Sequence, residues 1–135
     1  MAPSSSTLAR TLAAKRTTAP GSGVVPKDGD LLSARVRLFR VLGDPTRLRI
    51  LELLLQGPRT VSELVAATGV PQPRVSTHLA CLRWCKFVEA YPEGRRVTYS
   101  ARDRKVANLL RVASALAGPD VEHLASCRRI GPDWV

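Results

Sequence analysis

The stretch 70–85, VPQPRVSTHLACLRWC, combines polar residues at a helix opening with an apolar stripe and two cysteines one turn apart. At about 100° per residue, Val75, Leu79 and Leu82 lie on one side of a helix, and this stripe predicts a face that packs against a core. The polar residues near the start of the same helix then point away from the core. A helix exposed in this way is typical of a protein that reads DNA in the major groove.

Two helices are predicted before this one. Asp30 can cap a helix over 31–43, LLSARVRLFRVLG, whose apolar surface is wide enough to contact more than one neighbour. Asp44 followed by Pro45 is a strong start signal for the next helix, which ends at Gln56-Gly57-Pro58. The expected core face of this second helix consists of Leu48, Leu51, Leu54 and Leu55.

A capping box predicts a short helix directly before the helix over 70–85, which we call the reading helix. Thr60 and Glu63 match the pattern T-x-x-E, and the helix that they open stops at Gly69. Only the stretch 69–73 connects it to the reading helix. The two helices are therefore predicted to form a helix-turn-helix pair.

Alternating apolar and polar residues then predict a β-hairpin. Its strands are 87–91 and 97–100, around the loop Pro92-Glu93-Gly94-Arg95-Arg96. This hairpin is a wing with two arginines at its tip.

The last predicted helix begins after Asp103 and stops at Gly118-Pro119. Such an apolar terminal helix on a small domain indicates a dimer interface. The predicted fold class is mainly α with a small β-hairpin wing, that is, a dimeric winged helix-turn-helix. The apolar residues of the last helix that recur at helical spacing are Val106, Leu109, Leu110, Ala113, Leu116 and Ala117.

Composition divides the chain into three parts. Residues 1–29 are rich in Ser, Thr, Ala, Pro and Gly without apolar periodicity, so we expect a disordered basic arm. Residues 30–118 are expected to form one DNA-binding and dimerisation domain. Residues 119–135 form a tail with little periodicity, which carries Cys127.

The positive charge is concentrated in the predicted domain. The chain has 21 Lys+Arg against 11 Asp+Glu, a formal net charge of +10, and residues 31–118 hold 15 of these basic residues and 6 of the acidic ones. This favours a polyanionic partner. Nucleic acid is favoured over a membrane, because no amphipathic helix rich in aromatic residues is present.

Cysteine usage indicates a reducing cytoplasm. Cys81 and Cys85 lie one turn apart in the reading helix, and Cys127 makes the number odd. Residues 1–23 hold no apolar segment long enough for a secretory signal or a membrane span. We therefore expect a cytoplasmic protein without a membrane partner.

Two sets of residues are candidates for contact with double-stranded operator DNA. The start of the reading helix would reach base edges, and the wing would follow the backbone or the minor groove. A solvated hairpin tip is the alternative for the wing arginines, and a buried hydrogen-bonding role is the alternative for His78. The candidates are Gln72, Arg74, Ser76, Thr77 and His78 on the helix, and Arg95 and Arg96 on the wing.

The cysteine pair could hold a metal ion. Residues four apart on a helix have Cβ atoms about 5 to 6 Å apart, so Cys81 and Cys85 can direct two thiolates at one ion. Thiolates favour soft ions such as cadmium, lead, zinc or copper(I). Two alternatives stay open, since two cysteines at this spacing can also be small core residues or a redox or reactive-sulfur sensor.

The order of these features resembles the ArsR/SmtB family of bacterial winged-helix repressors. The resemblance covers roughly residues 31–118 and rests on LGDPTRLRIL, SELVAATGVPQPRVSTHLACLR and EGRRVTYS. It implies a homodimer that binds operator DNA and releases it when an inducer, commonly a metal ion, occupies the dimer.

The resemblance also separates the known kinds of metal site in the family. The arsenic and cadmium type carries a cysteine in an ELCV-like motif, where this chain reads TVSELVAA. The zinc and nickel type uses histidines and carboxylates on the last helix, where this chain reads VANLLRVASALAG. The segment HLACLRWC with a tail cysteine is similar to the CmtR-type cadmium/lead sensors, which implies that Cys127 of one protomer completes a site with Cys81 and Cys85 of the other.

The sequence therefore predicts a metal-responsive repressor that binds operator DNA as a homodimer. The predicted inducer is a soft divalent ion, cadmium or lead, with zinc possible, bound by Cys81, Cys85 and Cys127. A thiol-based redox or reactive-sulfur sensor on the same fold is the alternative. No catalytic role is expected, because a cysteine nucleophile needs a positioned base and the chain has only two histidines.

Overall fold

A computed structural model describes residues 27–101 and 103–128 of the chain. Within these ranges the chain divides into two units between Ala34 and Arg35, inside the first described helix. The predicted N-terminal arm lies outside the described residues except for its last three positions, and so does the end of the tail from residue 129.

The first two helices begin where the capping residues predicted. Helix α2 (Leu31–Leu42) starts after Asp30, whose side chain accepts the backbone N–H of Ser33 at 2.6 Å. Helix α3 (Pro45–Gln56) starts after Asp44, whose carboxylate accepts the N–H of Arg47 at 2.9 Å. Each carboxylate satisfies an N–H that has no partner within its helix.

The predicted helix-turn-helix pair is confirmed as α4 (Val61–Thr68) and α5 (Gln72–Trp84). Both halves of the capping box between Thr60 and Glu63 are present, and α4 ends at Gly69, whose φ of +71° is left-handed. In α5, the predicted stripe of Val75, Leu79 and Leu82 is fully buried.

The core face of α3 differs in part from the prediction. Leu51 and Leu54 are buried as expected, but Leu48 and Leu55 are only half-buried, and Ile50 and Leu53 take their places in the core. The reason is that α3 packs against α4, α5 and the sheet together. A helix surrounded on several sides buries a broader band than a single stripe.

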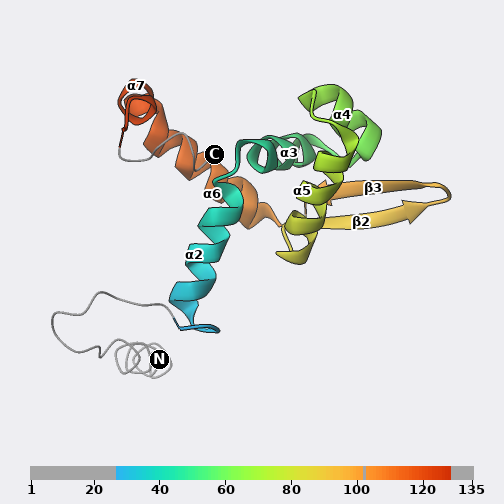
Figure 1. The fold of residues 1–135 in the computed structure, drawn as a ribbon, viewed down its shortest axis with the longest axis horizontal. Helices are drawn as coiled ribbons and strands as arrows, with labels where there is room; N and C mark the ends of the chain where they lie inside the picture. Colours follow the sequence, from blue (N-terminus) through green and yellow to red (C-terminus); the bar gives the residue numbers. More distant parts are fainter. Residues whose placement is uncertain (1–26, 102, 129–135) are drawn as a thin grey trace, which may run out of the picture. The chain divides into compact units, whose positions relative to one another are not determined.

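A three-stranded antiparallel sheet completes the described domain, with the strand order β1-β3-β2. Strand β1 (Arg59–Thr60) pairs with β3 (Arg96–Ala101), which pairs with β2 (Val88–Glu93). In Figure 1, β2 and β3 extend from beside α5 as a long two-stranded ribbon, which is the predicted wing.

The wing has a shorter loop than predicted. Pro92 and Glu93 belong to β2, where they pair with Val97 and Arg96, so the loop consists only of Gly94 and Arg95. Because β2 is an edge strand, the missing N–H of Pro92 need not interrupt the ladder. The φ of Gly94 is +62°, a conformation that two-residue hairpin loops require.

The last helix, α6 (Arg104–Ala117), begins as predicted, with the Asp103 carboxylate accepting the N–H of Lys105 at 2.9 Å. It does not end in an irregular tail, however. A 3-10 turn, η1 (Gly118–Asp120), and a short helix, α7 (Val121–Ala125), follow directly. Proline is compatible with the first turn of a helix, so Pro119 ends α6 while allowing a new turn to start. No helix in the described ranges is both long and apolar enough to cross a membrane.

Candidate nucleic-acid interface and thiol site

The start of α5 presents the predicted reading residues to solvent. Gln72, Arg74, Ser76 and Thr77 are all exposed, whereas the stripe of Val75, Leu79 and Leu82 is buried. The hydroxyl of Thr77 donates to the backbone carbonyl of Pro73 at 2.9 Å, which fixes its side chain along the helix. The structure therefore leaves the polar side of α5 available over its first two turns.

His78 lies at the edge of this surface, against a neighbouring helix. It is half-buried, and its Nδ1 lies 3.5 Å from Nη1 of Arg47 in α3. The same guanidinium donates from Nε to the carbonyl of Val41 at 2.8 Å. This position is closer to the hydrogen-bonding alternative for His78 than to a fully exposed reading residue.

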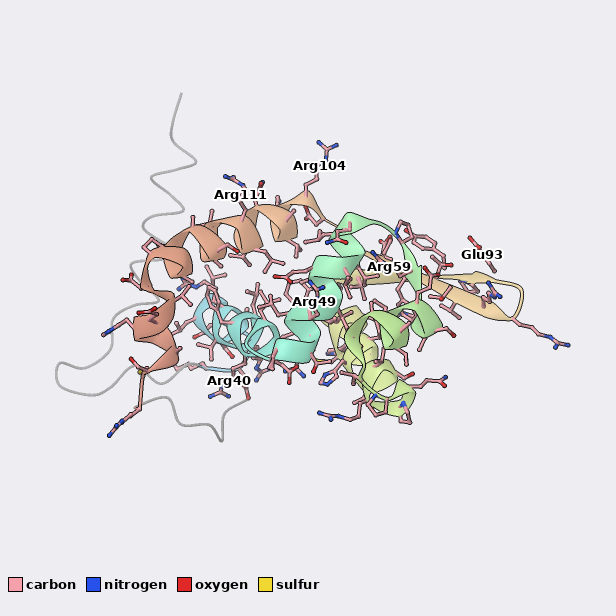
Figure 2. All side chains as sticks on the ribbon, turned by 90° about the horizontal axis from the view of Figure 1, so that it is seen from above. Arg40, Arg49, Arg59, Glu93, Arg104 and Arg111 are labelled. Carbon is pink, nitrogen blue, oxygen red and sulfur yellow. The ribbon has the colours of Figure 1, made fainter. Side chains whose placement is uncertain are left out.

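The wing arginines are exposed at the far end of the hairpin. Arg95 lies in the two-residue loop and Arg96 is the first residue of β3, opposite Glu93. Figure 2 shows Glu93 on this ribbon, well away from the labelled helical arginines. The hairpin thus carries positive charge beyond the helical part of the domain.

Arg47 was not singled out from the sequence, although it connects several elements. Burial of the Asp44 carboxyl raises its pKa, but the hydrogen bond from the Arg47 N–H, the positive charges of Arg47 and His78 and the hydrogen bond from Thr46 outweigh burial, so the pKa is lowered. The sequence gives one signal for this role, because an arginine three residues after an Asp-Pro cap lies on the first turn of its helix.

The thiols of Cys81 and Cys85 share one side of α5 and are half-buried. Burial raises the pKa of Cys85, and the adjacent Cys81 thiol raises it further, while the charge of Arg47 acts in the opposite direction. Cys85 also packs against the hydrophobic core. The raised pKa favours the neutral thiol of Cys85, and binding of a metal there must displace its proton.

Cys127 follows α7 and is half-buried, with its N–H donated to the carbonyl of Leu124 at 3.2 Å. Among the described residues, no group of three or more His, Cys, Asp or Glu side chains comes close enough to hold a metal ion. In the described part of the protomer, Cys127 is therefore not grouped with Cys81 and Cys85.

The terminal helices carry an apolar face that the described protomer does not cover. Of the predicted stripe on α6, only Val106 is buried, and Leu116 is 73% exposed. Figure 2 shows Arg104 and Arg111 extending from the opposite side of α6, away from α3. Other exposed large apolar residues on α6 and α7 are Val112, Val121 and Leu124.

Comparison with known families and proteins agrees with this arrangement. Residues 44–90, from the cap of α3 to the first half of the wing, match the family described as "Bacterial regulatory protein, arsR family". A probable mercury resistance operon repressor from Streptomyces lividans is 46% identical over 94 residues, which are 70% of this chain and 75% of that protein.

Two further proteins extend the comparison. The HTH-type transcriptional regulator CmtR of Mycobacterium tuberculosis is 47% identical over 78 residues, which cover 58% of this chain and 66% of that protein. A solution structure of a homodimeric winged helix-turn-helix DNA-binding domain from Mycobacterium bovis, a possible ArsR-family transcriptional regulator, has a TM-score of 0.64 and 33% identity. That match covers 76% of this chain and 94% of the solved one.

Proposed function

Because the chain belongs to the ArsR family of bacterial regulatory proteins, we propose that it is a transcriptional repressor that binds operator DNA as a homodimer and leaves it when a soft metal ion binds. The observation that carries this proposal is that the two halves of α5 hold different candidate residues. Its first half exposes Gln72, Arg74, Ser76 and Thr77, and its second half holds Cys81 and Cys85. A ligand on the thiols therefore acts on the helix that reads DNA.

Dimerisation is supported by the uncovered apolar face of α6 and α7. An exposed leucine such as Leu116 is unremarkable alone, but a continuous apolar stripe usually marks an interface. Two copies would present two reading helices and two wings, so the expected target is an imperfect inverted repeat. The homodimeric Mycobacterium bovis domain with the same fold agrees with this assembly.

The proposed inducer site consists of Cys81 and Cys85 from one protomer and Cys127 from its partner. The separation of Cys127 from the pair within one protomer supports a shared site. Three thiolates suit cadmium or lead, our first candidates, and zinc is a weaker one. The likeness to a protein named a mercury resistance repressor adds mercury to the ions to be tested.

Thiol redox or reactive-sulfur sensing is the second candidate on the same fold. Sensor cysteines of that kind are usually exposed thiolates with lowered pKa values. Burial and the Cys81 thiol instead raise the pKa of Cys85, which argues against a reactive thiolate at this position in the free protein. The relatives compared above are all named as regulators or repressors. Our proposal accordingly includes no enzymatic activity.

Titration with cadmium tests the metal site directly. Charge-transfer absorption from sulfur to metal should grow to saturation in the wild type and weaken in each of the Cys81→Ser, Cys85→Ser and Cys127→Ser variants. An unchanged stoichiometry and affinity in Cys127→Ser would remove the third ligand from the proposal. Mixing Cys127→Ser with Cys81→Ser/Cys85→Ser protomers should restore a site in the mixed dimer, and a failure there would argue against sharing.

Release from DNA tests the response. Promoter DNA bound by the reduced protein should dissociate when cadmium, lead, mercury or zinc is added in turn, with thiol oxidants as a parallel series. Release by oxidants alone, with no effect of any metal, would favour the second candidate. A protein that binds no duplex under any condition would contradict the repressor proposal itself.

A further inference from the structure

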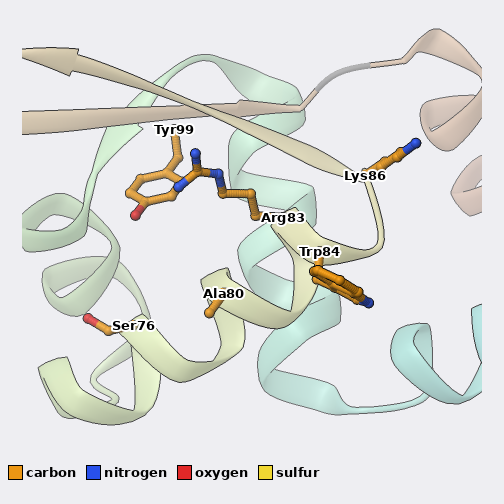
Figure 3. A pocket seen from close by; sticks show the side chains of 6 residues that line it. All are labelled: Ser76, Ala80, Arg83, Trp84, Lys86 and Tyr99. Carbon is orange, nitrogen blue, oxygen red and sulfur yellow. The ribbon is translucent and has the colours of Figure 1, made fainter.

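A recess lies between α5 and the sheet, next to the proposed reading surface. Its volume is about 610 Å³. In Figure 3, Ser76, Ala80 and Arg83 follow one another along one side of α5, and Arg83 reaches toward the ring of Tyr99. The residues that line the recess are Ser76, Ala80, Arg83, Trp84, Lys86 and Tyr99.

Lys86 occupies an unusual backbone position at one end of this recess. Its φ is +64°, and in the described part of the chain it is the only residue other than glycine with a positive φ. The N–H of Lys86 donates to the carbonyl of Arg83 at 3.0 Å, and the N–H of Phe87 donates to that of Leu82 at 2.9 Å. This pair of hydrogen bonds is the Schellman motif, which ends a helix with a left-handed residue.

Glycine suits this position better than lysine. The Cβ atom of an L-residue is crowded in the left-handed conformation, so lysine there costs stability relative to glycine. The chain itself uses Gly69 for the same conformation at the end of α4. A strained conformation held by an exposed charged residue points to a role for its side chain.

The chemistry of the recess suits a phosphate. Arg83 and Lys86 supply two positive charges at separate places, since Arg83 lies beside Tyr99 and Lys86 extends away from both in Figure 3. Ser76 and Tyr99 supply hydroxyl groups, and none of the six lining residues is acidic. Ala80 is small and exposed, so it lets a sugar-phosphate chain approach α5 closely. The recess continues the exposed side of α5, since Ser76 belongs both to the reading residues and to the lining.

We infer that this recess binds the sugar-phosphate backbone of the DNA duplex, and that Lys86 keeps its strained position because its ammonium group contacts a phosphate there. The inference rests on the proposed function, because it assumes that α5 lies against DNA. It adds Arg83, Lys86 and Tyr99 to the proposed interface. These contacts would position the reading helix without reading sequence.

Substitution of Lys86 by glycine separates the two effects. Lys86→Gly should raise the melting temperature by about 4 °C, because the backbone strain is relieved. The same variant should bind a mixed-sequence DNA duplex about tenfold more weakly, and the slope of log affinity against log salt should fall by about 2 for a dimer that loses two phosphate contacts. Lys86→Arg keeps the charge and should retain the affinity.

Lys105→Ala is the matched control. It removes one positive charge from an exposed position on α6 outside the recess and should leave the salt slope near that of the wild type. Fluorescence of Trp84, recorded in a Trp134→Phe background, should change when the duplex is added, because Trp84 lines the recess and is 87% exposed.

The outcomes distinguish this inference from the function on which it rests. Wild-type protein that binds duplex, with Lys86→Gly binding equally well at every salt concentration, would overturn the phosphate site and leave the repressor proposal standing. A lower melting temperature for Lys86→Gly would overturn the strain argument. Wild-type protein that binds no duplex would overturn both.

Discussion

The guanidinium of Arg47 meets two other helices from its place on the first turn of α3. It donates to the carbonyl of Val41 at the end of α2 and lies 3.5 Å from the His78 ring of α5. Its charge also lowers the pKa of Cys85, against the effects of burial and of Cys81. Arg47 therefore connects α3 to α2 and to the middle of α5, and its charge acts on the Cys85 thiol.

Removing this charge should make Cys85 less reactive. In Arg47→Gln, the pKa of Cys85 should rise further, because the only opposing charge is lost, and alkylation of Cys85 by iodoacetamide should need a higher pH. Peptide mass spectrometry after timed alkylation across a pH series gives the midpoint for Cys85. Arg49→Gln, on the same helix but exposed and ion-paired with Glu52, is the control.

Arg47→Lys tests whether the effect on the pKa of Cys85 comes from the charge of Arg47 or from its hydrogen bonds. It keeps the positive charge but not the guanidinium hydrogen bonds, so its midpoint should lie nearer to that of the wild type than that of Arg47→Gln. Equal midpoints for Arg47→Gln and the wild type would rule out the electrostatic role.

Asp44 allows a test of stability against pH. Its folded-state pKa is lowered, so its carboxylate adds stability above the ordinary pKa of the group, and this stability is lost as the pH falls through the lowered value. Asp44→Asn keeps a good capping side chain without the charge, whereas Asp44→Ala loses the cap and should cost about 1 kcal/mol at neutral pH.

Urea unfolding at a series of pH values measures this difference. The stability advantage of the wild type over Asp44→Asn should be largest near neutral pH and shrink toward strongly acidic pH. Other carboxyl groups titrate equally in both proteins and cancel in the comparison. An advantage that does not change with pH would show that the charge of Asp44 adds nothing to folding.

At the scale of elements, the sequence predicts helix starts best. Asp30, Asp44, Thr60 and Asp103 each cap the helix expected of them, because a cap depends on a side chain and backbone groups only two or three residues away. The buried stripe of α5 was predictable for the same reason, since a regular helix repeats every few residues.

Three other features could not be predicted from local sequence patterns. Strand β1 is two residues long and exists through its pairing with β3, about 40 positions later. The left-handed turn at Lys86 has no glycine to reveal it. The convergence of Cys81 and Cys85 follows from helical spacing, whereas the place of Cys127 depends on how α6, η1 and α7 follow one another.

The wing gives a prediction at this scale. Arg95→Ala and Arg96→Ala should each weaken binding to a mixed-sequence duplex and lower the salt slope by up to about 2 per dimer, since we propose that each arginine contacts one phosphate per protomer. Fluorescence anisotropy at several salt concentrations measures both quantities. Glu93→Gln, which removes a negative charge from the same hairpin, should act in the opposite direction. Salt slopes unaffected by either arginine variant would remove the wing from the interface.

At the scale of the whole molecule, two features of the described protomer motivate the proposed homodimer. The apolar face on α6 and α7 is uncovered, and Cys127 is not grouped with the cysteine pair on α5. The homodimer that we propose would cover the apolar face and bring a partner's tail toward the thiol pair. DNA binding, metal binding and dimerisation are then linked, and loss of the dimer should weaken the other two.

Leu116→Glu tests this linkage at the interface itself. Leu116 is 73% exposed, so glutamate should leave the protomer folded but place a charge in an apolar interface, and the dimer dissociation constant should rise by about two orders of magnitude. Ala107→Glu, nine residues earlier and so on the opposite side of the helix, is the matched control and should stay dimeric.

Sedimentation equilibrium measures the dimer, and the same samples can be tested for duplex binding and cadmium absorption. Monomeric Leu116→Glu should lose most of its DNA affinity and the contribution of Cys127 to the cadmium site, whereas a monomer that still binds cadmium with three thiolates would place that site within a single chain.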